Sequence, residues 1–240
     1  MKGVSYVINL ERRPDRLERF TKFYNEDGPS LPLEVFKAID GTNEQEFERV
    51  PQDIKDRVSQ NNDFKNSGPI TATAYSHLMV WSKIAQDYNH DYGMIYEDDC
   101  YFRNGNNNLK TSWPKLENSM PSGVLYFGVG DMLPIHTNPP SESMLRAQEI
   151  AHVQDSRQDK YFWGKPNFKC PYVFPWVGCS SMVLSRVTAQ FLLDLALKEP
   201  LQCAIDAWLV RTSKDLMYFS IPLFTYCPNR NDSDTWDQSR

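Results

Sequence analysis

Residues 94–99, Met94-Ile95-Tyr96-Glu97-Asp98-Asp99, join a short apolar run to three consecutive carboxylates. The apolar run predicts a buried strand, and the carboxylates stand where that strand ends. In open α/β sheets, ligands bind just beyond the carboxyl ends of the strands. Adjacent carboxylates at the end of a buried strand repel one another and need a cation. The alternative is an acidic loop that only solvates the end of the strand.

The spacing of these carboxylates predicts which of them hold the cation. Side chains two apart in a strand point to the same face, so we expect Glu97 and Asp99 on one side and Asp98 on the other. Two carboxylates at this spacing suit Mg²⁺ or Mn²⁺, the hard ions that also bind diphosphates. The cluster alone does not distinguish phosphoryl transfer, hydrolysis and glycosyl transfer.

Strand and helix patterns alternate along the rest of the chain. Apolar runs that predict strands lie at 4–10, 33–39, 94–96, 124–129, 177–184 and 217–223. Helices are predicted from Pro14, over 72–87, after Ser185 and over 204–212. In the helix after Ser185, we expect Phe191, Leu192 and Leu195 to share the inner face. This alternation predicts an α/β fold, a mainly parallel twisted sheet with helices on both faces. We expect a single domain over residues 1–240.

The segment 131–171 is polar, carries Pro139-Pro140, and is too long for an ordinary connection. Segments of this kind are usually lids or other functional insertions, and we expect a lid or an acceptor-side insertion here. Trp163 and Trp176 lie near its end, either as sugar-stacking rings or as packing residues.

Composition restricts the partners and the compartment. The net charge is −5, from 26 basic and 31 acidic residues, with no basic stripe, so nucleic acid is not expected as a partner. The five cysteines are scattered without a CxxC pair, which argues against a zinc site and against a disulfide framework. The N-terminus does not read as a signal peptide, and no apolar stretch is long enough to span a membrane. We therefore expect a cytoplasmic protein.

Several segments together resemble glycosyltransferase family 25, which includes lipooligosaccharide galactosyltransferases and collagen hydroxylysine galactosyltransferases. The most specific is 6–16, YVINLERRPDR, which is similar to the opening of that family. Further similar segments, in the same order, are Ser76-His77-Leu78 with Val80-Trp81 and Ile84, residues 94–99, residues 181–186, and Ile205-Asp206. Residues 71–75, TATAY, depart from the family, which usually has Gly and Cys there.

The resemblance implies a GT-A fold, a UDP-sugar donor, Mn²⁺ (or Mg²⁺) dependence and inversion at the anomeric carbon. It implies transfer of galactose or another hexose to a hydroxyl acceptor on a glycan or a hydroxylysine-type protein. A non-catalytic relative that binds a nucleotide sugar and acts as a partner module is the alternative. A metal-dependent phosphoesterase is a third reading, but it would need more histidines and carboxylates than the sequence places together.

The resemblance also assigns residues to the donor site. The predicted donor-binding residues are Ile8, Asn9, Leu10, Arg13, Ser76, His77, Glu97 and Asp98. We expect Asn9 to contact the base and Arg13 or Arg16 to reach polar groups of the donor. Alternatively, the two arginines only pair with acids of their own helix, and His77 is a satisfied histidine behind the sheet.

Inversion needs a base that deprotonates the acceptor hydroxyl, and Asp206 is the predicted one. It lies early in a predicted helix, within an apolar segment. A carboxylate in such a segment is unfavourable unless it has a specific role. The alternative is that Asp206 only favours the positive end of that helix. Asp232 and Asp234 are second choices, as the base or as a metal ligand. His136 and His152 could each supply a third metal ligand or be plain loop residues.

Overall fold

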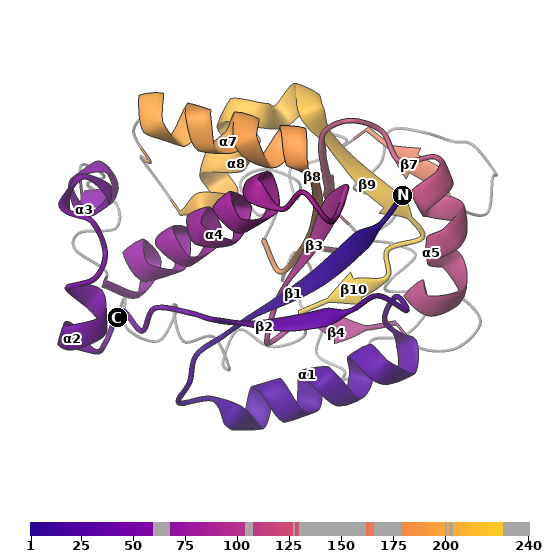
Figure 1. The fold of residues 1–240 in the computed structure, drawn as a ribbon, viewed down its shortest axis with the longest axis horizontal. Coiled ribbons are helices and arrows are strands. Elements are labelled where there is room, and N and C mark those ends of the chain that lie inside the picture. The colour runs from indigo at the N-terminus through magenta and orange to yellow at the C-terminus, as the bar shows by residue number, and fades with distance from the viewer. Residues whose placement is uncertain are drawn as a thin grey trace.

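The first strand, β1 (Gly3–Asn9), is buried along its whole length, as its continuous apolar run predicted. The computed structural model describes residues 1–59, 68–103, 108–126, 128–129, 162–165, 179–199, 201 and 204–227 (Figure 1). On either side of β1 lie β2 (Leu33–Lys37) and β3 (Tyr92–Glu97), both parallel to it. These three strands form one half of the main sheet.

Four more strands complete this sheet, in the order β2-β1-β3-β8-β5-β9-β7. They are β8 (Ser181–Ser185), β5 (Val124–Tyr126), β9 (Met217–Ile221) and β7 (Phe162–Gly164). Five of these seven strands run in one direction, whereas β8 and β7 run antiparallel to their neighbours. The α/β fold and the predominant strand direction are confirmed, and the sheet is mixed.

Helices cover both faces of the sheet, as predicted (Figure 1). One face carries α4 (Gly68–Gln86), α7 (Arg186–Lys198) and α8 (Ile205–Ser213). The opposite face carries α1 (Pro14–Asp27) and α5 (Leu109–Asn118). The short helices α2 (Glu44–Phe47) and α3 (Gln52–Ser59) follow β2 at one end of the molecule.

A small second sheet lies beside the first and has the order β4-β10-β6. Its strands are β4 (Tyr101–Phe102), β10 (Thr225–Tyr226) and β6 (Gly128–Val129). The strand predicted over 124–129 is therefore two strands in two sheets. This small sheet follows directly after the carboxylates of residues 97–99, so it borders the region where a site was expected.

The local signals explain most helix ends, with two corrections. Pro14 begins α1, and the hydroxyl of Ser185 caps α7 by accepting a hydrogen bond from the Thr188 backbone, both as predicted. The helix predicted from residue 72 begins earlier, at Gly68. Phe191, expected on the inner face of α7, is 45% exposed, because Thr188, Ala189, Leu192 and Ala196 form that face instead.

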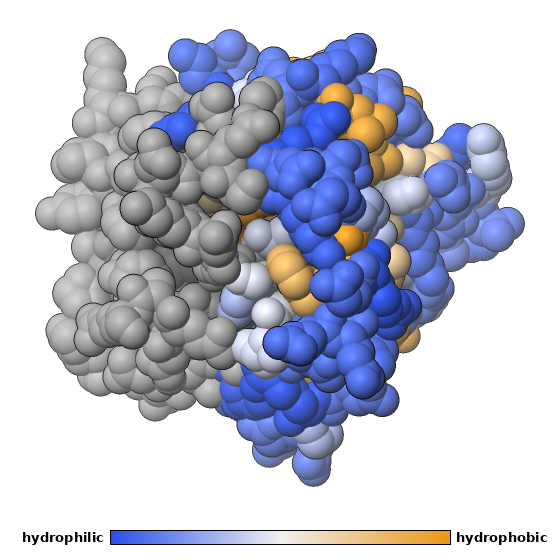
Figure 2. All heavy atoms as spheres, turned by 90° about the vertical axis from the view of Figure 1, so that its left-hand side faces the viewer, coloured by the Kyte–Doolittle hydropathy of each residue, from blue (hydrophilic) through white to orange (hydrophobic). Residues whose placement is uncertain are grey.

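The end of the molecule that carries α2 and α3 faces the viewer in Figure 2, where the coloured surface is mainly hydrophilic with small apolar areas between. Among the described residues, no helix combines the length and the apolar character needed to cross a lipid bilayer.

Candidate functional site

The register between β1 and β3 places their last side chains on two faces of the sheet. Ile8 is paired with Glu97, so Asn9 lies beside Asp98. Alternation along β3 directs Ile95 toward the α4 face and Tyr96 toward the α1 face. Glu97 therefore points to the α4 side and Asp98 to the α1 side, as predicted from the sequence.

On the α1 side, Asp98 is held in a buried polar cluster. Asn9 Nδ2 donates to one oxygen of Asp98 at 2.7 Å, and Arg16 Nη1 donates to the other at 3.2 Å. Asn9 Nδ2 also lies 3.0 Å from the carbonyl oxygen of Arg13, which ties the β1–α1 turn to the end of β3. Burial raises the pKa of Asp98, and the Arg16 charge opposes this effect. The cluster fixes the backbone at the end of β3, next to which the other two carboxylates lie.

On the α4 side, Glu97 is oriented by a histidine. The Glu97 Oε1 atom lies 3.0 Å from His77 Nε2, and the His77 side chain is completely buried. Because a carboxylate oxygen accepts hydrogen bonds, this contact selects the His77 tautomer in which Nε2 is the donor. The His77 Nδ1 atom is also buried and has no hydrogen-bond partner among the residues that the structure describes. His77 therefore presents its one satisfied nitrogen to Glu97, which remains partly exposed.

Asp99 lies beyond the strand, in a turn closed by a hydrogen bond from the Cys100 N–H to the Glu97 carbonyl oxygen. The strand alternation that predicted Glu97 and Asp99 on one side therefore does not extend to Asp99. Its Oδ1 atom accepts a hydrogen bond from Cys227 Sγ at 3.6 Å. Burial and the neighbouring charges of Glu97 and Asp98 raise the pKa of Asp99 to about 7. A nearby cation would relieve this repulsion.

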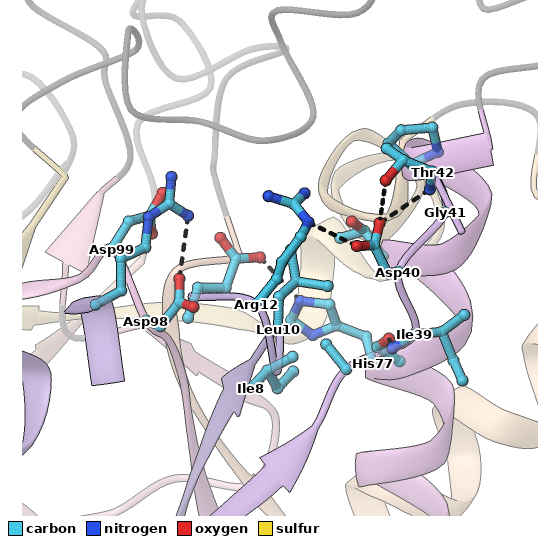
Figure 3. Close-up of a pocket in the computed structure, with 16 residues that line it drawn as sticks. Ile8, Leu10, Arg12, Ile39, Asp40, Gly41, Thr42, His77, Asp98 and Asp99 are labelled. Atoms are coloured by element: carbon cyan, nitrogen blue, oxygen red, sulfur yellow. Dashed lines mark hydrogen bonds and ion pairs between the residues drawn. The ribbon is translucent and has the colours of Figure 1, made fainter. Parts of the chain in front are cut away.

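The three carboxylates form one wall of a pocket (Figure 3). The opposite wall is the segment after β2, with Asp40, Gly41 and Thr42, while Leu10 and Arg12 lie between the two walls. The other residues that line it are Ile8, Arg16, Ala38, Ile39, Pro69, Thr73, Ser76 and His77. A ligand in this pocket would contact the carboxylates and the 39–42 segment at the same time.

The 39–42 segment is a rigid polar turn. One oxygen of Asp40 accepts hydrogen bonds from the Thr42 N–H at 2.9 Å and from its hydroxyl at 2.7 Å. The other oxygen accepts from Arg12 Nε at 2.6 Å. Burial opposes ionisation of Asp40, but these hydrogen bonds prevail and lower its pKa. The sequence analysis did not identify Arg12, Asp40 or Thr42 as candidate site residues.

Ser76 and Arg13, both predicted to bind the donor, each form hydrogen bonds to other parts of the chain. The Ser76 hydroxyl accepts from the Ile39 N–H at 3.1 Å and donates to the Ala72 carbonyl at 2.8 Å, so it fastens the 39–42 segment to α4. The Arg13 Nε and Nη2 atoms lie 3.0 and 2.9 Å from the Asp15 carboxylate. This is the local pairing that was the alternative for Arg13. Ser76, Arg12 and Arg16 line the pocket, whereas Arg13 is not among the described residues that line it.

Asp206, the predicted base, lies in the first turn of α8. Its Oδ1 atom accepts a hydrogen bond from the Ala207 N–H at 2.7 Å, and burial raises its pKa to about 6. Burial is the main cause of this shift and the charge of Glu97 adds to it, but Asp206 is not among the described residues that line the pocket. A carboxyl group with a pKa near neutrality can accept a proton at physiological pH.

One of the two predicted tryptophans is described by the structure, and it lies away from the pocket. Trp163 is buried in β7, where its Nε1 atom donates to the Leu116 carbonyl at 3.0 Å, so it is a packing residue. The remaining candidates lie outside the described residues: His136, His152, Trp176, Asp232 and Asp234.

Two carboxylates of the pocket fit a divalent cation. Glu97 and Asp99 supply hard oxygen donors, and the charge crowding at Asp99 favours a bound cation. Within the described ranges, no group of three or more His, Cys, Asp or Glu side chains is arranged to hold a metal ion. Water and a ligand's oxygens often complete the shell of Mg²⁺, so two protein ligands are sufficient for such a site.

Comparison with protein families and curated proteins gives two matches. The family described as "Glycosyltransferase family 25 (LPS biosynthesis protein)" matches residues 3–209. The procollagen lysyl hydroxylase and glycosyltransferase of Acanthamoeba polyphaga mimivirus is 31% identical over 83 residues. That alignment covers 33% of this chain and 9% of the viral protein, so the chain spans a small part of that relative.

Two solved structures are similar over most of the chain. Mouse xyloside xylosyltransferase 1, in its apo form, aligns over 90% of this chain and 71% of its own, with 9% identity and a TM-score of 0.42. A Drosophila β1,4-galactosyltransferase 7 mutant, in complex with manganese, UDP-Gal and xylobiose, aligns over 91% and 70%, with 10% identity and a TM-score of 0.33. At these scores neither structure transfers a ligand or a residue role to this chain.

Proposed function

The chain belongs to glycosyltransferase family 25, and we propose that it transfers galactose or another hexose from a UDP-sugar to a hydroxyl acceptor, with inversion at the anomeric carbon. The acceptor hydroxyl would belong to a glycan or to a hydroxylysine-type protein. The observation that carries this proposal is the pocket between the carboxylates of residues 97–99 and the Asp40–Thr42 turn. A nucleoside diphosphate needs polar groups that bind its sugar and base, and a cation that binds its phosphates. The Asp40–Thr42 turn would supply the polar groups, and the carboxylates would hold the cation.

Glu97 and Asp99 would hold Mn²⁺ or Mg²⁺. The ion, when bound, neutralises charge on the leaving diphosphate as a Lewis acid. The supporting observations are the raised pKa of Asp99, which a cation would reverse, and the orientation of Glu97 by the buried His77. Partners of this kind commonly fix metal-binding carboxylates in one geometry.

The nucleoside of the donor would lie between Ile8 and Leu10 on one side and the Asp40–Thr42 turn on the other. Arg12 would reach the polar groups of the donor, since it lines the pocket and Arg13 is paired with Asp15. Asn9 and Asp98 would act indirectly, because their buried cluster fixes the turn at the floor of the pocket. Ser76 would do the same for the opposite wall.

Asp206 would accept the proton of the acceptor hydroxyl as that oxygen attacks the anomeric carbon. Its burial in the first turn of α8 holds its pKa near 6, so the carboxylate is ionised at neutral pH but retains appreciable basicity. The bond to UDP breaks as the new glycosidic bond forms, and the proton moves to the Asp206 carboxylate.

The proposal is tested by measuring UDP release in the presence of Mn²⁺ from UDP-galactose, UDP-glucose and UDP-N-acetylglucosamine. Each donor is assayed alone, with a galactose-terminated oligosaccharide, and with a hydroxylysine-containing collagen peptide. We expect acceptor-stimulated release with one donor, loss of release in Asp99→Asn, and no loss in Asp194→Asn, which changes an exposed carboxylate on α7. UDP-sugar binding without release for every acceptor would support a non-catalytic binding protein instead.

A further inference from the structure

The strands β4 and β10 bring two cysteines opposite each other. The antiparallel ladder pairs Phe102 with Thr225 and Tyr101 with Tyr226. If the same register continues one step beyond the ends of both strands, it places Cys100 opposite Cys227.

The hydrogen-bond pattern of this ladder shows which kind of pair the cysteines form. The Arg103 N–H donates to the Phe224 carbonyl at 2.7 Å, so that pair is hydrogen-bonded. Hydrogen-bonded and non-hydrogen-bonded pairs alternate in an antiparallel ladder, which makes Cys100 and Cys227 a non-hydrogen-bonded pair. The Cα atoms of such pairs are about 4.5 Å apart, within the range that a disulfide spans.

Both thiols also lie on the same face and are free. Directly opposite side chains in a ladder share a face, and Cys100 interacts with Thr225, which lies two residues before Cys227 on that face. Cys100 is 1% exposed and Cys227 is partly exposed, and burial together with the Asp99 charge raises the pKa of both thiols, so we expect exchange with a small disulfide to be slow.

Both cysteines are neighbours of Asp99. Cys100 follows Asp99 in the chain, and Cys227 Sγ donates the 3.6 Å hydrogen bond to Asp99 Oδ1. A disulfide would consume the Cys227 hydrogen, remove this donor from the carboxylate, and tie the turn of residues 97–100 to β10.

We propose that Cys100 and Cys227 form a reversible disulfide that weakens divalent-cation binding at Asp99. The second half of this proposal rests on the proposed function. The oxidant is a low-molecular-weight disulfide, such as oxidised glutathione. The Cys227 sulfur attacks it, forms a mixed disulfide and releases one glutathione; Cys100 then attacks the Cys227 sulfur and releases the second. The two protein thiols are oxidised, one glutathione disulfide is reduced, and the two protons end on the two glutathione thiols.

The linkage is tested directly by peptide mapping of the whole chain. Trypsin places Cys100 in peptide 84–103 and Cys227 in peptide 215–230, and each peptide has a single cysteine. After treatment with oxidised glutathione, alkylation and digestion, we expect these two peptides linked, and separated again by dithiothreitol. If both cysteines are alkylated instead, or each is linked to another cysteine, the pair does not exist.

The effect on the cation is tested by titrating Mn²⁺ and following the free ion by electron paramagnetic resonance. We expect the oxidised chain to bind Mn²⁺ about tenfold more weakly than the reduced chain, with recovery after reduction. Cys227→Ser, whose hydroxyl can still donate to Asp99, should be insensitive to oxidised glutathione, whereas Cys179→Ser should respond like the natural chain.

The two halves of the proposal fail separately. A linked peptide with unchanged Mn²⁺ affinity would overturn the control of the site by the disulfide. A reduced chain that binds no Mn²⁺ would overturn the metal part of the proposed function, while the linked peptide would still establish the cysteine pair.

Discussion

Arg16 and Asp98 form an ion pair between α1 and the end of β3, with Nη1 and Oδ1 3.2 Å apart and the two side chains only 4% and 7% exposed. The pair links residues that are 82 positions apart in the sequence. Asn9 occupies the remaining oxygen of Asp98. The middle carboxylate of the cluster is thereby paired, while Glu97 and Asp99 also line the pocket that a ligand would enter.

Replacing Arg16 with methionine should strongly destabilise the fold. The change leaves Asp98 buried without its cation, and breaking a buried pair by removing one partner costs about 3–5 kcal/mol. The measurement is the free energy of unfolding in urea. Glu34→Gln is the matched control, because it breaks an exposed pair with Lys83 and should cost less than about 1 kcal/mol. A cost for Arg16→Met as small as that of the control would show that Asp98 does not depend on this pair.

Replacing His77 with leucine should weaken Mn²⁺ binding by about 10- to 100-fold, because Glu97 loses the donor that orients it. His77→Gln can place an amide N–H near the position of Nε2 and should restore much of the affinity. Mn²⁺ titration checks both variants, and circular dichroism checks that they fold. Equal affinities for the leucine and glutamine variants would mean that His77 only packs.

Replacing Asp206 with asparagine should reduce kcat by about 100- to 10,000-fold while UDP binding is retained, since only the proton acceptor is lost. In the natural chain, burial raises the pKa of Asp206 to about 6, so the base is protonated below that pH. At saturating Mn²⁺, activity should fall about tenfold per pH unit below pH 6 and be level just above it. A rate profile that keeps the same acidic limb in Asp206→Asn would assign that limb to another group.

Replacing Gly41 with alanine should disturb the wall opposite the carboxylates. A Cβ atom at this position would lie 2.3 Å from the backbone carbon and oxygen of Gly68, at the start of α4. We expect a loss of about 1–3 kcal/mol in unfolding free energy, as for other overpacked sites, and weaker UDP binding. Gln45→Ala, at an exposed position of α2, is the control and should change stability by no more than about 0.5 kcal/mol. Unchanged stability and UDP affinity in Gly41→Ala would show that this close approach is not needed.

The strands and most helices were predictable because their signals are local. The continuous apolar run of β1 predicts that strand, and Ser185 predicts the start of α7; both signals lie within a few residues of sequence. Helix α5 was not predicted, because Pro114 and the preceding asparagines argue against a helix. The buried residues Leu109, Trp113 and Leu116 nevertheless have helical spacing. The split of 124–129 into β5 and β6 depends on which strands lie alongside, which no local pattern records.

The candidate site was predictable only in part, for the same reason. The alternation along β3 correctly separated Glu97 from Asp98, but it could not name His77 or Arg16 as their respective partners. The pairing of Arg12 with Asp40 joins two loops 28 residues apart and has no sequence signature of its own. Tertiary packing determines which residues contact a buried carboxylate, so the structure was needed to identify them.

The most direct test of the central claim, a divalent cation held by Glu97 and Asp99 against a diphosphate, is calorimetric titration of UDP into the chain with and without Mn²⁺. We predict that UDP binds with Mn²⁺, and that binding falls at least about tenfold when the ion is chelated or when Asp99 is replaced by alanine. Equal UDP affinity under all three conditions would contradict the account, because the carboxylates would then hold no ion that the nucleotide uses.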